Sequence, residues 1–167
     1  EMRYKQTATH ANKTVTTYYV GKVFEQINTT ENGTISTEKR HYLGDYAVLS
    51  HKPEGKTLSY LHRDRLGSVS LVTSGDQHLS EVSSFHQLVQ QRRGYDVFGK
   101  ARDLYWADSL GGLLNSDITT RGFTNHEHLD DVELIHMNGR GYDYNLGRFL
   151  SVDPFIQFPD NSQSLNP

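Results

Sequence analysis

Histidine and acidic side chains gather in one short stretch near the end of the chain, in a pattern that could bind a metal ion. They are His126, Glu127, His128, Asp130, Asp131 and His136. In an extended strand, His126 and His128 project to one face, where two imidazoles and a carboxylate from elsewhere could bind a divalent cation. The spacing differs from the helical His-Glu-x-x-His signature of metalloproteases. We therefore predict structural roles for both histidines and no cofactor.

Two arginines close to this stretch suggest a different chemistry. Arg140 and Arg148 flank a segment that contains Tyr142 and Tyr144. A guanidinium group can stack on an aromatic ring and can also pair with a carboxylate through two hydrogen bonds. We expect a structural clamp here in preference to a substrate-binding site.

A second basic cluster is too sparse for nucleic-acid binding. It consists of Arg92, Arg93, Lys100 and Arg102. We interpret it as a solvated strand face, because a nucleic-acid interface needs a longer basic stripe. The surroundings of Ser109 lack the nucleophile-elbow pattern, so the sequence does not support a serine hydrolase.

Composition excludes several classes of protein. The chain has 167 residues, a formal net charge of −3, 35% hydrophobic residues and no cysteine. It therefore contains no disulfide, thiolate metal site or cysteine nucleophile, and no apolar run long enough for a transmembrane helix. Its slight acidity argues against a nucleic-acid partner. The first residue is Glu1, which suggests a piece of a longer protein.

The elements that must position these side chains are predicted to be strands. The sequence is rich in tyrosine, threonine and valine, which favour strands, and in glycine and asparagine, which favour turns. We predict an all-β fold of stacked antiparallel hairpins, with one short helix around 80–91 or, as the alternative, a strand at 88–93. We expect a loop at 104–118. The predicted strands are 13–20, 22–27, 37–43, 46–50, 57–62, 68–73, 118–123, 134–137, 140–144 and 149–152.

Several turns can be predicted from short motifs. Asn32-Gly33, within a longer predicted turn over 28–34, is a strong hairpin signal. Asp64 to Gly67 has the pattern of a type I turn that joins two strands. The segments 64–67, 96–99 and 144–147 share one plan, in which glycine closes the turn and another strand follows. Irregular repeats of this kind suggest hairpins stacked in one continuous sheet.

These repeats resemble a known family. The run Tyr95-Asp96-Val97-Phe98-Gly99-Lys100 resembles the tyrosine–aspartate (YD) repeat of RHS proteins, and 60–69 and 119–130 resemble another element of the same family. The segment 134–157 is similar to the RHS repeat-associated core, and residues of about 40–160 match in order. The motif residues that carry the resemblance are Tyr95, Asp96, Gly99, Arg140, Tyr142, Asp143, Gly147 and Arg148.

The resemblance implies a fold and a domain organisation. RHS proteins resemble a hollow shell in which one β-sheet spirals around a cavity. On this basis the chain is expected to form part of such a shell. Residues 1–58 would be diverged YD-type repeats, and 59–167 would be the repeat-associated core, within one continuous β structure.

The resemblance also suggests a catalytic candidate. Some family members contain an aspartyl autoprotease that releases a toxin inside the shell, and Asp153 lies in the matching motif. Such proteolysis needs two carboxylates that share a proton, and Asp143 or Asp160 could be the second by spacing. The sequence stops at Pro167, before an Asp-Pro-x-Gly cleavage motif. We therefore expect no enzymatic activity from this segment alone.

The leading functional prediction is structural. The chain would be a segment of a toxin shell that encloses a C-terminal toxic effector and helps to deliver it in bacterial competition. Its partners would be the C-terminal toxin domain and the rest of the shell, with secretion-system (such as type VI) or immunity proteins as further candidates, and it would be secreted or at the bacterial cell surface. The alternatives are the autoprotease end of the shell and a teneurin-like surface module that binds a partner or a glycan.

Overall fold

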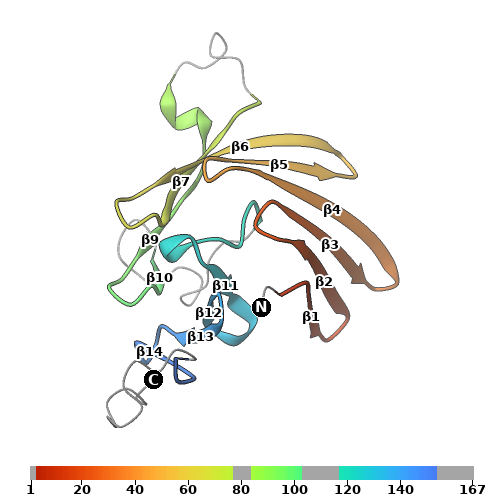
Figure 1. The fold of residues 1–167 in the computed structure, drawn as a ribbon. Coiled ribbons are helices and arrows are strands. Elements are labelled where there is room, and N and C mark those ends of the chain that lie inside the picture. The colour runs from red at the N-terminus through yellow and green to blue at the C-terminus, as the bar shows by residue number, and fades with distance from the viewer. Residues whose placement is uncertain (1–2, 77–83, 103–116, 154–167) are drawn as a thin grey trace, which may run out of the picture. The chain divides into compact units, whose positions relative to one another are not determined.

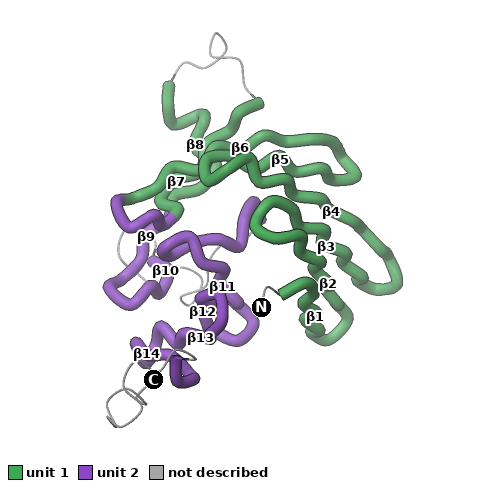
Figure 2. Tube along the Cα trace, in the orientation of Figure 1, with its two compact units in different colours: residues 1–64, 69–92 green, residues 65–68, 93–167 purple. Residues whose placement is uncertain are grey.

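The computed structural model describes residues 3–76, 84–102 and 117–153 (Figure 1). Its regular structure consists of antiparallel strands, and the helical elements of these described ranges are short 3-10 turns. The predicted all-β fold of stacked hairpins is therefore confirmed. The chain divides into two compact units, residues 1–64 with 69–92 and residues 65–68 with 93–167 (Figure 2).

The first unit is built on one antiparallel sheet of eight strands. Each strand pairs with its neighbours in the chain, so the order in the sheet is the order in the sequence. The strands are β1 (Lys5–His10), β2 (Lys13–Val20), β3 (Phe24–Glu31), β4 (Thr34–Leu43), β5 (Ala47–Lys52), β6 (Gly55–Arg63), β7 (Val69–Ser74) and β8 (Val89–Arg92).

Turn chemistry sets the register of this sheet. Asn32 and Gly33 have φ angles of 50° and 81°, as a two-residue hairpin turn of type I′ requires. The turn pairs Glu31 directly with Thr34. The predicted turn over 28–34 is too long, because Asn28 to Glu31 continue β3 by pairing with β4. The strands on either side of Asp64 to Gly67 pair as predicted.

Burial alternates along the central strands. Tyr42 and Val48 lie opposite each other and are almost fully buried, as are Leu61 and Val72. Arg40 is buried on the same face as Tyr42, because side chains two apart on a strand share a face. Its guanidinium donates to both carboxylate oxygens of Glu38, at 2.8 and 3.3 Å. An ion pair therefore lies within the core layer of this sheet.

The predicted helix around 80–91 is mostly replaced by other structure where it is described. Residues 77–83 lie outside the described residues. A single 3-10 turn covers Phe85–Leu88, and β8 follows at once. The alternative strand prediction therefore accounts for the second half of this segment.

The second unit contains two small sheets. The first pairs β9 (Gly94–Tyr95) with β10 (Ala101–Arg102). The second joins β11 (Glu127–Leu129), β12 (Leu134–Met137), β13 (Arg140–Asp143) and β14 (Arg148–Phe149) in that order. The hairpin predicted around Asn138-Gly139 is confirmed by the pairing of β12 with β13.

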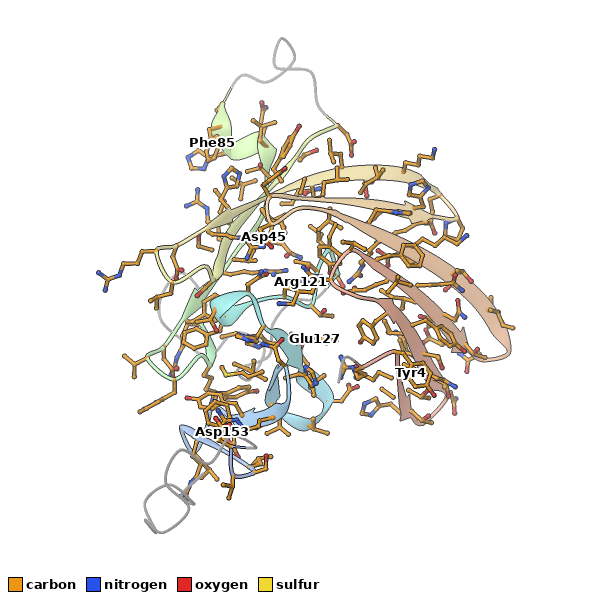
Figure 3. All side chains as sticks on the ribbon, viewed as in Figure 1. Tyr4, Asp45, Phe85, Arg121, Glu127 and Asp153 are labelled. Atoms are coloured by element: carbon orange, nitrogen blue, oxygen red, sulfur yellow. The ribbon has the colours of Figure 1, made fainter. Side chains whose placement is uncertain are left out.

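Two predicted strands of this unit differ from the structure. The predicted strand at 118–123 is wrong, because only Arg121 makes a bridge, to Glu127, and a 3-10 turn starts at Phe123. Figure 3 labels Arg121 and Glu127. The last strand is β14, two residues long, where 149–152 was predicted. Most of the predicted loop 104–118 lies outside the described residues.

The predicted domain boundary after residue 58 falls inside β6. The assignment of 1–58 and 59–167 to different kinds of repeat stays a prediction. No helix in the described part of the chain is long and apolar enough to cross a membrane.

Candidate functional site

The YD motif at residues 95–100 forms a tight turn between β9 and β10. The carboxylate of Asp96 accepts hydrogen bonds from the backbone N–H groups of Phe98 and Lys100, at 2.8 and 3.0 Å. Gly99 closes the turn with φ of 94°, and its N–H donates to the Asp96 carbonyl. Aspartate is suited to this position because its short side chain reaches the backbone two residues further on.

The motif at residues 142–147 forms a second turn of the same design. The Asp143 carboxylate accepts from the N–H groups of Asn145 and Leu146, at 2.8 and 3.0 Å. Gly147 again closes the turn, and its N–H donates to the Asp143 carbonyl at 2.8 Å. The tyrosine, aspartate and glycine of each motif thus lie in two similar turns, although the glycine follows the aspartate by three residues in the first turn and by four in the second. Arg140 and Arg148 lie outside the two turns.

The two turns pack against each other. The Phe98 ring lies so close to Gly147 that a Cβ atom there would be 2.9 Å from it. Tyr142, in β13, is close enough to both turns for Asp96 and Asp143 to raise its pKa, after the larger effect of burial. We call residues 95–100 and 142–147 together the paired YD turns.

An aromatic cluster supports the paired YD turns. The Tyr95 ring lies 5.8 Å from the rings of both Phe123 and His128, and His128 stacks on Tyr144 at 6.3 Å. His128 and Tyr144 are only 3% and 2% exposed. The His128 Nε2 accepts a hydrogen bond from the Phe123 N–H. The pKa of His128 falls to about 3, first because burial opposes the charged form and then because of the nearby Arg93 and His126.

The two candidate metal-binding histidines have separate environments. The His126 ring contacts the Thr124 hydroxyl and the Asn138 amide, at 2.9 and 3.3 Å, whereas His128 is packed among aromatic rings. Across residues 3–76, 84–102 and 117–153, no three histidine or acidic side chains are grouped to hold a metal ion. The geometry of His128 is that of a neutral core residue.

The catalytic candidate Asp153 lies beside an arginine. Its carboxylate is 3.1 Å from an Arg140 amino group, and the Arg140 guanidinium lies 3.6 Å from the Phe149 ring centre. Figure 3 labels Asp153 at the end of the described chain. Arg148 is exposed. Asp143 is engaged in its turn, and Asp160 lies outside the described residues.

One structural residue was misread from the sequence. The predicted solvated face holds for Arg92, which is exposed, but it is wrong for Arg93, which is 9% exposed. Arg93 donates to the carbonyls of Arg121 and Thr119, at 3.0 and 3.3 Å. The alternation of inward and outward side chains was the signal that could have separated these neighbours.

With this geometry established, comparison with known proteins identifies a shared fold. No protein-family model matches the chain, and no curated protein matches its sequence. The chain shares its fold with part of the TcdB2-TccC3 structures. It superposes on the structure of TcdB2-TccC3 with Cdc42 with a TM-score of 0.70 and 19% identity, over 97% of this chain.

Two further structures agree. TcdB2-TccC3, and the same protein without its hypervariable C-terminal region, each match 90% of this chain with a TM-score of 0.66, at 18% and 17% identity. In all three cases the chain spans only 7% of the matched chain. At this level of identity the likeness establishes the fold alone.

Proposed function

We propose that this chain is a structural segment of an RHS-type shell that encloses a toxic effector and helps to deliver it. The observation that carries the proposal is the fold match to TcdB2-TccC3 over 90–97% of the chain. The paired YD turns support it independently, because their residues are those of the family motif.

The site residues have structural tasks in this proposal. Asp96 and Asp143 hold turn backbones, and Phe98 packs one turn on the other. Arg140 holds the segment after β14 through Asp153 and Phe149. The partners would be the C-terminal toxin domain and the rest of the shell, with secretion-system or immunity proteins as further candidates, in a protein that is secreted or at the bacterial cell surface.

The test is the structure of the longest natural polypeptide that contains this sequence. We expect cryo-electron microscopy to show the sheet of the first unit continuing through further strands around a hollow interior. Residues beyond the shell segment should resist protease until the shell is opened. A solid domain with these strands at its surface, and no enclosed chain, would overturn the proposal.

The catalytic role of Asp153 stays a prediction. In the same longer polypeptide, Asp153→Asn should abolish self-cleavage if Asp153 belongs to a carboxylate pair. Asp143→Asn tests the second carboxylate, because it leaves the Arg140 ion pair intact and should also abolish self-cleavage if Asp143 is the partner of Asp153. Full cleavage in Asp153→Asn would assign Asp153 to the structural ion pair alone.

A further inference from the structure

Two hairpin turns of the chain carry an asparagine followed by a glycine. Asn32-Gly33 joins β3 to β4, and Asn138-Gly139 joins β12 to β13. All four residues are exposed, and a Cβ atom at either glycine would meet nothing within 4 Å. The backbone nitrogen of such a glycine can attack the amide carbon of the preceding asparagine, because no side chain on the glycine obstructs the approach.

The two turns differ in backbone conformation. Asn32 and Gly33 both have positive φ, as in a type I′ turn. Asn138 has φ of 58°, whereas φ of Gly139 is not positive, which is the combination of a type II′ turn. The first central residue has ψ of about +30° in a type I′ turn and about −120° in a type II′ turn.

This difference decides which asparagine is prepared for ring closure. In a succinimide ring the asparagine Cβ and the glycine nitrogen are eclipsed about the Cα–C bond. For an L-residue that arrangement corresponds to ψ of about −120°, the value at the first position of a type II′ turn. Asn32 would have to rotate by about 150°, which would break the pairing of Glu31 with Thr34.

A histidine lies beside the amide of Asn138. The Nε2 of His126 is 3.3 Å from the Asn138 Nδ2, and its Nδ1 is 2.9 Å from the Thr124 hydroxyl. In the neutral ring, Nε2 accepts from the Asn138 amide and the Nδ1–H donates to Thr124. In the protonated ring, the Nε2–H can donate to the same nitrogen once it has become an amine in the tetrahedral intermediate.

Asn32 lacks such a neighbour. In the described ranges, the Asn32 backbone N–H donates to the Asn12 carbonyl at 3.2 Å, and its side-chain amide makes no hydrogen bond or ion pair. Asn138 therefore combines a backbone suited to ring closure with an adjacent proton donor, whereas Asn32 has neither.

We propose that Asn138 is a site of spontaneous deamidation, promoted by its turn and by His126. The Gly139 nitrogen gives its proton to a solvent base and bonds to the Asn138 Cγ. The Cγ–Nδ2 bond then breaks, and Nδ2 takes a proton from His126 and leaves as ammonia. His126 regains its proton from solvent. Water finally opens the succinimide at either carbonyl, which leaves aspartate or isoaspartate at position 138.

The modification would change the geometry of the second unit. Isoaspartate adds a methylene group to the backbone of the two-residue turn that sets Met137 opposite Arg140. The strand that follows carries Tyr142 and leads into the Asp143 turn. The inference goes beyond the proposed shell function, because it gives this segment a covalent change that accumulates with time.

The test follows both asparagines during incubation of the 167-residue chain at neutral pH. Peptide mapping by mass spectrometry would measure deamidation at each position, and methylation by an isoaspartate methyltransferase would identify isoaspartate. Asn138 should convert about tenfold faster than Asn32, which is less than the roughly 100-fold effect of a fully positioned general acid. In concentrated urea the two rates should become similar. Equal rates in the folded chain, or faster conversion of Asn32, would overturn the proposal.

Two variants test the part played by His126. His126→Gln keeps a hydrogen-bonding side chain but cannot transfer a proton, so conversion of Asn138 should slow about tenfold while that of Asn32 stays the same. Thr124→Ala removes the hydroxyl that orients the ring and should slow Asn138 to a smaller extent. Circular dichroism would check folding. An unchanged Asn138 rate in both folded variants would overturn the role of His126 and with it the proposal.

Discussion

At the scale of single residues, close contacts in the second unit leave little room for substitution. Gly99 has both a left-handed backbone and a crowded position, because a Cβ atom there would lie 2.6 Å from the Phe123 ring. Gly67 has a similar φ of 82°, yet a Cβ atom there would meet nothing within 4 Å. Substitutions at these two glycines therefore distinguish the cost of backbone strain, which both share, from the cost of overpacking, which only Gly99 has.

Gly99→Ala should destabilise the protein more than Gly67→Ala does. Both variants incur backbone strain of about 1–3 kcal/mol, and only Gly99→Ala adds overpacking of about 1–3 kcal/mol. Denaturant unfolding of both variants would measure the difference. Equal losses of stability in the two variants would show that the Phe123 ring moves aside without a loss of free energy.

His128 should make the second unit sensitive to acid. Its pKa is about 3 in the folded protein and 6.5 unperturbed, so the unfolded chain binds the proton more readily between these values. Stability is fully present above about pH 6.5 and should fall by up to about 1.4 kcal/mol per pH unit as the pH drops. Unfolding curves from pH 7 to pH 4 would measure this slope.

The control for this prediction is His128→Phe. The aromatic replacement cannot be protonated, so its stability should depend less on pH over the same range. An identical slope in both proteins would assign the acid sensitivity to other groups.

At the alkaline end, burial raises the pKa of Tyr144 to about 12, so stability should fall above about pH 10, where the unfolded chain loses this proton.

At the scale of elements, one buried arginine helps to hold a segment without regular structure, alongside backbone hydrogen bonds between that segment and His126 and His128. Thr119 is fully buried, yet residues 117–122 form no strand beyond the bridge at Arg121. Arg93 supplies hydrogen bonds to their carbonyls that a sheet would otherwise provide. This interaction ties the chain just after β8 to a segment more than 25 residues away.

Arg93→Met should destabilise the second unit by about 2–4 kcal/mol. The variant loses the hydrogen bonds that the charged Arg93 donates, and the two carbonyls that accept them stay buried without these bonds. Arg92→Met is the matched control, since Arg92 is exposed, and it should change stability by less than about 0.5 kcal/mol. Thermal unfolding followed by near-ultraviolet circular dichroism would compare them. Similar effects of both variants would contradict a special role for Arg93.

At the scale of the whole molecule, the eight-stranded sheet has an exposed edge. In the described residues β1 pairs with β2 alone. The Tyr19 N–H donates a hydrogen bond to the Tyr4 carbonyl. Because hydrogen-bonded and non-hydrogen-bonded residue pairs alternate along two antiparallel strands, this bond identifies which residues of β1 do not bond to β2. The backbone N–H and C=O groups of Lys5, Thr7 and Thr9 therefore point away from β2, and such an edge favours pairing with another chain.

We expect the isolated chain to self-associate through β1 as its concentration rises. Thr7→Pro should reduce the association, because proline removes an outward N–H without breaking the ladder to β2. Sedimentation velocity over a wide concentration range would measure both proteins. A wild-type chain that stays monomeric throughout would contradict the prediction.

The sequence by itself determined the class of fold and much of its local structure. Turn motifs such as Asn32-Gly33 and the YD runs depend on backbone conformations that few residues adopt, so they can be read locally. Alternating strands between them followed from β-branched and aromatic residues. The tyrosine, aspartate and glycine of each YD turn were likewise predictable as a structural motif.

Only the tertiary structure decided which of these motifs meet. The contact between Phe98 and Gly147, the anchoring by Arg93 and the pairing of Asp153 with Arg140 join residues that are distant in sequence or in irregular segments. The alignment of Lys5, Lys39 and Lys56 also depends on five successive strand registers. A shift of one residue in any of these registers would send some of the three lysines to the other face of the sheet, and no local sequence pattern fixes all five registers together.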